Sequence, residues 1–284
     1  MTYELKTLVD EMKVGLIGCG AIGAALAQLI DSGEAGGVEL GWVYDLKLER
    51  CKRLVSGLKN KPRILRRVAE IYEDEDVDIV VEAASQEAVR QYSLDVLRSG
   101  KDLIILSVGA LSGEDLLNSL RTEAMNLGRK IYIPSGAVVG IDGAKASSLR
   151  EIKEVRLTTR KPPSAFKNNE YLKRKGIKLS GLRGPKVIFS GTAREAVKFF
   201  PASVNVAATL SLAGVGFDRT LVRIVADPRI KRNIHEIRIR GEAGELLTRS
   251  LNVPFPESPR TSYLAALSVA RTLKNLSETV QVGT

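Results

Sequence analysis

The chain has 284 residues, of which 44% are hydrophobic and 27% are charged, so it can bury one large core or two ordinary ones and is not a disordered chain. Its longest apolar runs, such as "LIILSVGAL" at 103–111, are too short to span a bilayer, which predicts a soluble protein without membrane contact. The formal net charge of +10 is compatible with nucleic acid, with an acidic small substrate or with a solvated basic surface.

The densest basic run lies at 168–186, and its composition favours a solvated loop over a nucleic-acid site. It contains a single aromatic residue, Tyr171, so it lacks the aromatic platform on which bases stack. The two cysteines, Cys19 and Cys51, are too few for a disulfide framework or a zinc cluster, so no metal site is expected. The N-terminus has neither the basic start nor the apolar stretch of a secretory signal, which indicates a cytoplasmic protein.

Near the N-terminus, the segment "KVGLIGCGAIGAALAQLI" predicts a strand, a tight turn and a helix. Its glycines, Gly18, Gly20 and Gly23, have the GxGxxG spacing of a dinucleotide-binding fold. The first glycine permits the turn, the second lets the backbone approach the pyrophosphate, and the third allows close packing of helix on strand. Ala21 and Ile22 begin the helix, whose N-terminal N–H groups are expected to bind the cofactor phosphates.

Four further apolar runs, separated by helical patterns, continue the alternation. The runs are "VELGWVYD", "DVDIVVEAAS", "DLIILSVGA" and "KIYIPSGA", and two helices between them are expected to end at Gly100 and Gly128. Short strands joined by crossover helices form a parallel, doubly wound sheet. Residues 1–140 are therefore predicted to be a dinucleotide-binding Rossmann domain, with an N-terminal extension at 1–11 that carries no chemistry.

Asp45 closes the second strand of this domain and is the candidate for cofactor selection. Its carboxylate is expected to bind the adenosine ribose and to repel a 2′-phosphate, which favours NAD over NADP. Lys47 and Arg50 follow closely, so NADP use stays open. Ala84 and Ser85 follow the fourth strand, at the edge of the sheet where the nicotinamide half of the cofactor is expected.

The second half of the chain has the pattern of an antiparallel-rich α+β domain, predicted at 141–255. Strands are expected in "EIKEVRLTTRK", "PKVIFSG" and "TLVRIVAD", short helices in "TAREAVKFF" and "NVAATLSLAG", and a hairpin formed by "NIHEIRIRG" and "ELLTRSLNV". In 256–284, an apolar stripe that includes Ala266, Val269 and Leu273 predicts a helix packing back on the Rossmann domain.

His235, the single histidine of the chain, lies in the strand "NIHEIRIRG". Strand alternation places it on one face with Asn233, Ile237 and Ile239, so it is either a core histidine or a catalytic one. Its position at the start of the strand, beside the expected cleft, favours catalysis. Redox chemistry on the Rossmann domain also requires a proton carrier, and imidazole is the usual one near neutral pH.

Several blocks of sequence resemble the L-aspartate dehydrogenase family across nearly the whole chain. They are "GLIGCGAIG", "VEAASQEAV", "IYIPSGAVVGIDG", "VRLTTRKPP", "FPASVNVAATLSLAG", "NIHEIRIRGEAGEL" and "SPRTSYLAALSVARTLKNL". The resemblance implies NAD(P)-dependent oxidative deamination of L-aspartate, through iminoaspartate, to oxaloacetate and ammonia, with iminoaspartate feeding NAD biosynthesis. It also implies that His235 is the active-site residue, that Asn205 and Ala137 contact the cofactor, and that the protein is a homodimer.

The chemistry of this reaction suits a neutral imidazole and a cationic pocket. After hydride loss the imine needs an activated water, and His235 can deprotonate that water and hand the proton to the departing ammonia. The two carboxylates of the substrate need cationic and hydroxyl donors. Thr159 and Lys161 share one face of the strand "RLTTRK" and are favoured for this role; Arg160, on the other face, and Thr209 are further candidates.

Two other functions remain open from the sequence. One is a reductase of the dihydrodipicolinate reductase or homoserine dehydrogenase type, which shares the two-domain plan and handles aspartate-derived substrates. The other is an NAD-sensing regulator without turnover. A regulator of this kind is expected to carry a DNA-reading module, and no helix-turn-helix pattern is visible at either end of the sequence.

Overall fold

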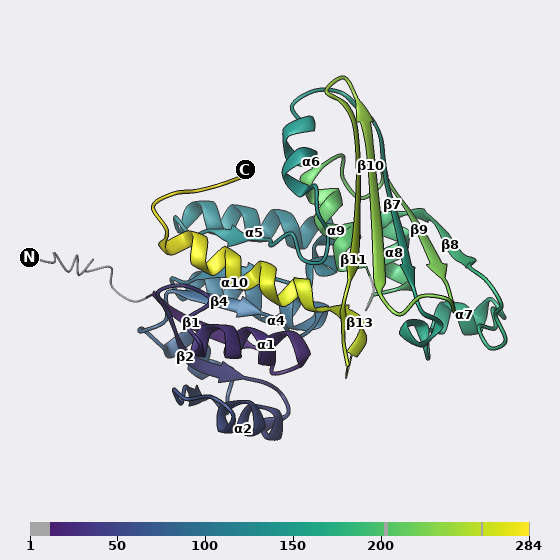
Figure 1. Ribbon diagram of the computed structural model, residues 1–284. Coiled ribbons are helices and arrows are strands. Elements are labelled where there is room, and N and C mark those ends of the chain that lie inside the picture. The colour runs from purple at the N-terminus through teal and green to yellow at the C-terminus, as the bar shows by residue number, and fades with distance from the viewer. Residues whose placement is uncertain (1–11, 202–203, 257, 284) are drawn as a thin grey trace, which may run out of the picture.

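The computed structural model describes residues 12–201, 204–256 and 258–283, so the extension predicted at 1–11 lies outside the described residues. The first half of the chain forms a six-stranded parallel sheet in the order β3-β2-β1-β4-β5-β6 (Figure 1). Its strands are β1 (Met12–Ile17), β2 (Val38–Tyr44), β3 (Arg63–Ile64), β4 (Ile79–Glu82), β5 (Asp102–Ile105) and β6 (Ile131–Tyr132). From β1 the chain adds strands toward β3 on one side, and from β4 it adds strands toward β6 on the other. The switch point therefore lies between β1 and β4, and a doubly wound sheet binds its ligand at this point.

Helices cover both faces of this sheet. On one face α1 (Ala21–Asp31) and the C-terminal α10 (Tyr263–Ser277) pack against each other and share an apolar cluster. On the other face lie α4 (Gln86–Arg98) and α5 (Glu114–Asn126). The shorter elements are α2 (Leu48–Ser56), α3 (Ala69–Glu73) and the 3₁₀ turn η1 (Val108–Ser112). In the described ranges no helix combines the length and apolarity needed to cross a bilayer.

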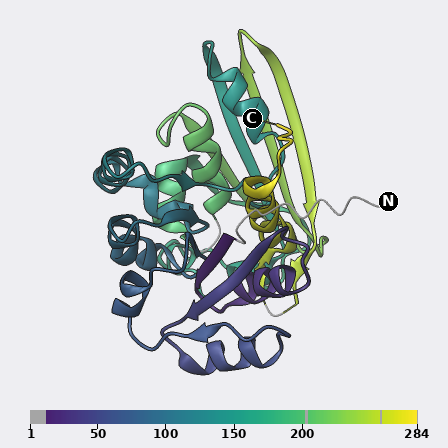
Figure 2. The same cartoon turned by 90° about the vertical axis from the view of Figure 1, so that its left-hand side faces the viewer.

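The second half of the chain forms a five-stranded sheet in the order β11-β10-β7-β9-β8. Its strands are β7 (Ile152–Lys161), β8 (Lys186–Thr192), β9 (Thr220–Ala226), β10 (Asn233–Gly241) and β11 (Gly244–Asn252). Only the β7–β9 pair among these strands is parallel. Figure 2 shows these long strands rising along one side of the molecule, away from the first sheet.

Among the described residues, helices cover one face of the second sheet and leave the other face open. They are α6 (Ile141–Ser147), α7 (Glu170–Arg174), α8 (Ala193–Phe199) and α9 (Asn205–Ala213), with the 3₁₀ turn η2 (Pro163–Phe166). A short ribbon, β12 (Pro254–Phe255) with β13 (Ser258–Ser262), leads from this sheet to α10. The predicted fold class is therefore confirmed: a Rossmann-like domain, a second α+β domain, and a C-terminal helix packed on the first.

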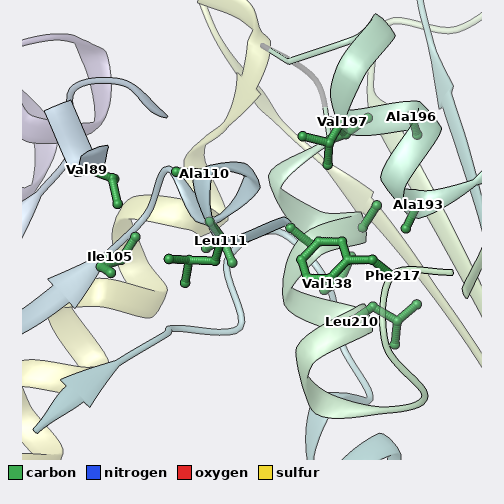
Figure 3. Packing of buried hydrophobic residues seen from close by; sticks show 14 of the residues in the cluster. Val89, Ile105, Ala110, Leu111, Val138, Ala193, Ala196, Val197, Leu210 and Phe217 are labelled. Carbon is green, nitrogen blue, oxygen red and sulfur yellow. The ribbon is translucent and has the colours of Figure 1, made fainter. Parts of the chain in front are cut away.

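The two sheets share one continuous apolar core. In Figure 3, Ile105 and Leu111 lie on the side of the first sheet. They approach Val138, Leu210 and Phe217 on the side of the second sheet. All five residues belong to a single buried cluster. The 3₁₀ turn η1 packs directly on α9 at this junction. Hydrophobic burial therefore fixes how the two halves sit relative to each other.

One predicted strand is short, and one local expectation was wrong. The run "KIYIPSGA" forms the predicted last strand of the sheet, but it pairs only at Ile131–Tyr132, because Pro134 has no N–H to donate and Gly136 has a φ of +68°. The basic run at 168–186 is not all solvated loop, because it contains α7. Tyr171 of that helix packs on three phenylalanine rings, those of Phe189, Phe199 and Phe200.

Candidate active site

The turn after β1 fits a bound dinucleotide. Gly18 has a φ of +103°, and a Cβ there would lie 2.7 Å from the backbone of Ala83. A Cβ on Gly23 would lie 1.9 Å from the Gly18 carbonyl oxygen, so α1 can approach the turn this closely only with glycine. Gly20 is the N-cap of α1, and nothing lies within 4 Å of where its Cβ would stand. The N–H groups at this helix end are therefore open to an anion.

Asp45 holds the glycine turn in place. Its carboxylate accepts hydrogen bonds from the backbone N–H of Cys19 at 2.9 Å and of Lys47 at 2.8 Å. Arg50 lies 3.8 Å from the same carboxylate. The side chain is one-tenth exposed and lies behind the residues that line the adjacent cleft. Asp45 thus has a structural role in addition to the ribose contact expected of it.

A cleft of about 1300 Å³ runs past the glycine turn and the ends of β4 and β5. It exceeds the roughly 300–1000 Å³ of pockets for drug-sized ligands, as a dinucleotide requires. Predicted cofactor residues that line it are Gly20, Ala21, Ile22, Ala84, Ser85 and Asn205. Arg53 and Arg194 also line it, and sequence reasoning missed both. Arg53 lies on α2, near enough to Asp45 in sequence to have been a candidate.

A smaller pocket of about 110 Å³ opens beside this cleft, and Ile22, Leu106 and Asn205 line both. Six residues predicted from the sequence line the smaller pocket: Ile22, His235, Lys161, Thr209, Ala137 and Asn205. They come from α1, β10, β7, α9 and the loop after β6, so the two domains together build the pocket. Its volume suits a small metabolite.

His235 is a buried, uncharged imidazole. It is 3% exposed, and its Nδ1 lies 3.0 Å from the Oγ1 of Thr159 on the neighbouring strand β7. Burial, reinforced by the positive charge of Lys161, lowers the pKa of His235 to about 3. Thr159 therefore lies behind the histidine, where it orients the ring, and it is not among the residues that line the pocket.

Lys161 is the buried cation of the pocket. It is 3% exposed, and its Nζ donates a 2.8 Å hydrogen bond to the backbone carbonyl of Arg260 in β13. Burial, with a smaller effect of the Arg260 charge, lowers the pKa of Lys161 to about 8. Arg260 also lines the pocket, and the described lining residues include no aspartate or glutamate. The pocket thus presents positive charge without a compensating carboxylate.

Hydrogen bonds hold Asn205, which lines both the cleft and the pocket, and Ala137, which lines the pocket. Asn205 is the first residue of α9, and its Oδ1 accepts a hydrogen bond from the backbone N–H of Gly109 at 3.3 Å. The carbonyl of Ala137 accepts from Asn252 at 2.7 Å and from Ser250 at 3.1 Å. Hydrogen bonds therefore fix the position of both residues at the smaller pocket.

Arg160 does not reach the pocket. Its guanidinium pairs with Asp227 at 3.2 Å, and strand alternation turns it away from Thr159 and Lys161.

Sequence reasoning also missed Arg260. The block "SPRTS" before the last helix carried a basic residue, but nothing in its spacing indicated that β13 crosses the substrate pocket.

Two family models match the chain in succession. A model described as the NAD binding domain of homoserine dehydrogenase matches residues 18–134, and one described as the C-terminal domain of aspartate dehydrogenase matches residues 142–276. The matched ranges correspond to the two sheets.

Full-length relatives point the same way. The L-aspartate dehydrogenase of Methanosarcina mazei is 47% identical over 273 residues, which cover 96% of this chain and 100% of that protein. That of Methanocaldococcus jannaschii is 41% identical, with the same coverage. The crystal structure of aspartate dehydrogenase from Thermotoga maritima matches with a TM-score of 0.71 and 33% identity, covering 96% and 99% of the two chains. A homoserine dehydrogenase from Thiobacillus denitrificans, 13% identical with a TM-score of 0.57 over 94% and 74% of the two chains, shares only the fold.

Proposed function

The chain belongs to the L-aspartate dehydrogenase family, and on this premise we propose how its pocket carries out the reaction. The protein is an NAD(P)-dependent oxidoreductase that converts L-aspartate, through iminoaspartate, to oxaloacetate and ammonia. One observation supports the pocket assignment most directly. Lys161 and Arg260 line this small pocket, and none of its described lining residues is an aspartate or a glutamate. A dicarboxylate substrate requires such a pocket, because a carboxylate side chain there would repel it.

We assign the two carboxylates of L-aspartate to these two cations. The Lys161 ammonium uses one of its three protons for the Arg260 carbonyl, which leaves two for a substrate carboxylate. Arg260 lines the same pocket, and we propose that its guanidinium fork binds the second carboxylate. The Thr209 hydroxyl lines the same pocket and supplies a further donor.

His235 is the proposed proton carrier. A base at Nε2 requires Nδ1 to carry the hydrogen and donate it to Thr159 Oγ1, an arrangement the 3.0 Å separation allows. A substrate carboxylate beside Lys161 offsets the positive charge that lowers the pKa of His235, so substrate binding makes the imidazole more basic. The ring then deprotonates the water that attacks the imine and returns the proton to the departing ammonia.

The cofactor is NAD or NADP, and when bound it accepts the hydride from the α-carbon of aspartate. The glycine turn, with Gly18, Gly20 and Gly23, is proposed to receive the pyrophosphate. Ala21, Ile22, Ala84, Ser85, Ala137 and Asn205 are proposed as further cofactor contacts. Asp45 favours NAD by repulsion of a 2′-phosphate, whereas Arg50 and Arg53 on the cleft wall attract one.

Initial-rate reduction of NAD at alkaline pH tests the substrate assignment. The panel is L-aspartate, D-aspartate, L-glutamate, L-malate and L-homoserine. Turnover of L-aspartate alone is expected, because the pocket has two cations but little length for glutamate. Turnover of L-homoserine without L-aspartate would favour the reductase alternative, and NADH binding without any turnover would favour the sensor. Neither alternative is favoured by the relatives, which are L-aspartate dehydrogenases over their full length.

A homodimer is proposed through the open face of the second sheet. The register aligns Leu247, Arg238, Arg156 and Leu221 in one row across that face, and the two leucines are 71% and 40% exposed. Exposed leucines on a sheet face that no helix covers favour a partner surface. Sedimentation of the wild type and of Leu247→Glu tests this assembly, since the variant is expected to shift toward monomer.

The remaining proposals concern cellular context and domain limits. Cys19 and Cys51 have free thiols whose sulfurs lie 3.5 Å apart, which supports a reducing, cytoplasmic setting.

We also propose that the iminoaspartate formed here supplies NAD biosynthesis. The proposed domain limits are 1–140, 141–255 and 256–284.

A further inference from the structure

Glu82 is a buried carboxylate that the proposed chemistry does not use. It is the last residue of β4 and is 2% exposed. Burial of a charge in a protein interior is costly unless hydrogen bonds compensate it. The surroundings of Glu82 therefore require an explanation.

The Glu82 carboxylate accepts four hydrogen bonds from two separate loops. Its Oε1 accepts from the backbone N–H groups of Ala84 at 2.8 Å and Ser85 at 2.9 Å, in the loop after β4. The same oxygen accepts from the Ser107 hydroxyl at 2.9 Å, and Oε2 accepts from the Ser107 backbone N–H at 2.9 Å. Burial raises the pKa of Glu82, and these four donors oppose that effect because they stabilise the ionised carboxylate.

Both loops form the wall of the cofactor cleft. Ala84, Ser85 and Ser107 line the cleft, and Leu106, next to Ser107, lines both the cleft and the substrate pocket. The first loop is also tied to the glycine turn, because the backbone N–H of Ala83 donates to the carbonyl of Ile17 at 2.8 Å. The Glu82 side chain thus links the loops after β4 and β5, and a backbone hydrogen bond joins the first of these loops to the end of β1.

We propose that Glu82 is a positioning residue for the cofactor, holding the loops after β4 and β5 in the register that binds the dinucleotide. This inference rests on the proposed function for the cleft. A carboxylate is suited to the task because it accepts from both sides at once, whereas an amide or hydroxyl offers fewer acceptor positions. The two loops follow the neighbouring parallel strands β4 and β5, so the distance between the loops depends on both of them.

Glu82→Gln tests this role with almost no change of shape. The amide oxygen can keep the Ala84, Ser85 and hydroxyl contacts, but the NH₂ group then faces the Ser107 backbone N–H, and two donors repel. Loss of one charge-assisted hydrogen bond with an unpaired donor is expected to weaken NADH binding about tenfold or more. Ser107→Ala removes only the hydroxyl contact and is expected to weaken NADH binding about threefold.

The measurement is the NADH dissociation constant by fluorescence titration, with the KM values for NAD and L-aspartate beside it. The matched control is Glu39→Gln, the same substitution on an exposed residue of the same sheet, which is expected to leave all three values unchanged. For both test variants the KM for NAD is expected to rise, while the KM for L-aspartate at saturating NAD stays within about twofold of wild type.

A purely structural role for Glu82 would lower the melting temperature without moving the NADH dissociation constant, and that outcome overturns the proposal. If Glu82→Gln does not fold, Ser107→Ala decides: an unchanged dissociation constant in that variant also overturns it. Wild-type protein that binds NADH but does not oxidise aspartate would contradict the proposed function alone, since the titration requires no turnover.

Discussion

The buried imidazole of His235 predicts a specific loss of stability in mild acid. The folded-state pKa is about 3, whereas an unfolded histidine titrates at 6.5. Below pH 6.5 the unfolded chain takes up a proton that the folded chain excludes, so the free energy of unfolding falls as the pH falls from 6.5 toward 3. Above pH 6.5 the imidazole is neutral in both states and contributes no pH dependence.

The magnitude follows from the two pKa values. Between about pH 7.5 and pH 5 the expected loss is about 2 kcal/mol, and below the folded-state pKa it approaches about 5 kcal/mol. His235 is the single histidine of the chain, so few other groups titrate in the upper part of this range. Glutamine at this position is uncharged and can still hydrogen-bond Thr159, so His235→Gln is expected to abolish the loss.

Urea unfolding of both proteins at the two pH values measures the effect. Buffers without carboxylates are needed, because a carboxylate would occupy the pocket beside Lys161. Equal pH dependence in the wild type and His235→Gln would refute a neutral buried histidine. An independent check is the single imidazole resonance in the proton NMR spectrum, which is expected not to shift between pH 7.5 and pH 5 in the ligand-free protein.

Three further predictions concern activity. His235→Ala is expected to lower kcat by about a hundredfold or more while the NADH dissociation constant changes less than about twofold; equal loss of binding and fold in circular dichroism would restore a core role for the histidine. Lys161, whose pKa is about 8, is protonated below that pH and loses its charge above it. The ratio of wild-type kcat/KM for L-aspartate to that of Lys161→Arg is therefore expected to fall as the pH rises through 8, and a flat ratio would argue against carboxylate binding by this lysine. Asp45→Ala is expected to raise NADP use relative to NAD about tenfold, because one repulsive charge is removed, and an unchanged ratio in steady-state kinetics would exclude the ribose assignment.

Much of the fold was predictable because its signals are local. The glycine turn, the alternation of apolar runs with helices, and the hairpin around "EAG" each follow from neighbouring residues, and each is present. The failures had long-range causes. Helix α7 lies in the basic run at 168–186, and its partly buried Tyr171 packs on phenylalanines from β8 and α8, which no pattern within the run reveals.

The pocket was partly predictable for the same reason. Strand alternation paired Lys161 with Thr159 and separated both from Arg160, and that separation is seen. Alternation says which face a residue occupies but not what crosses that face. Arg260 could not be foreseen because β13 reaches the pocket only through tertiary contacts, such as the bond from Lys161 to its backbone carbonyl. Glu82 was hidden because its partners lie on two loops.

The apolar junction between η1 and α9 has a consequence for how the enzyme meets its ligands. Swinging the two halves apart would expose Leu111, Leu210 and Phe217 to water, so hinge opening carries a hydrophobic cost that grows with the angle. The geometry between cofactor cleft and substrate pocket is therefore preset. Folding alone therefore places the cleft and the pocket in their final relative position, and no domain closure is needed at each turnover. Heating is expected to unfold both halves in one cooperative transition.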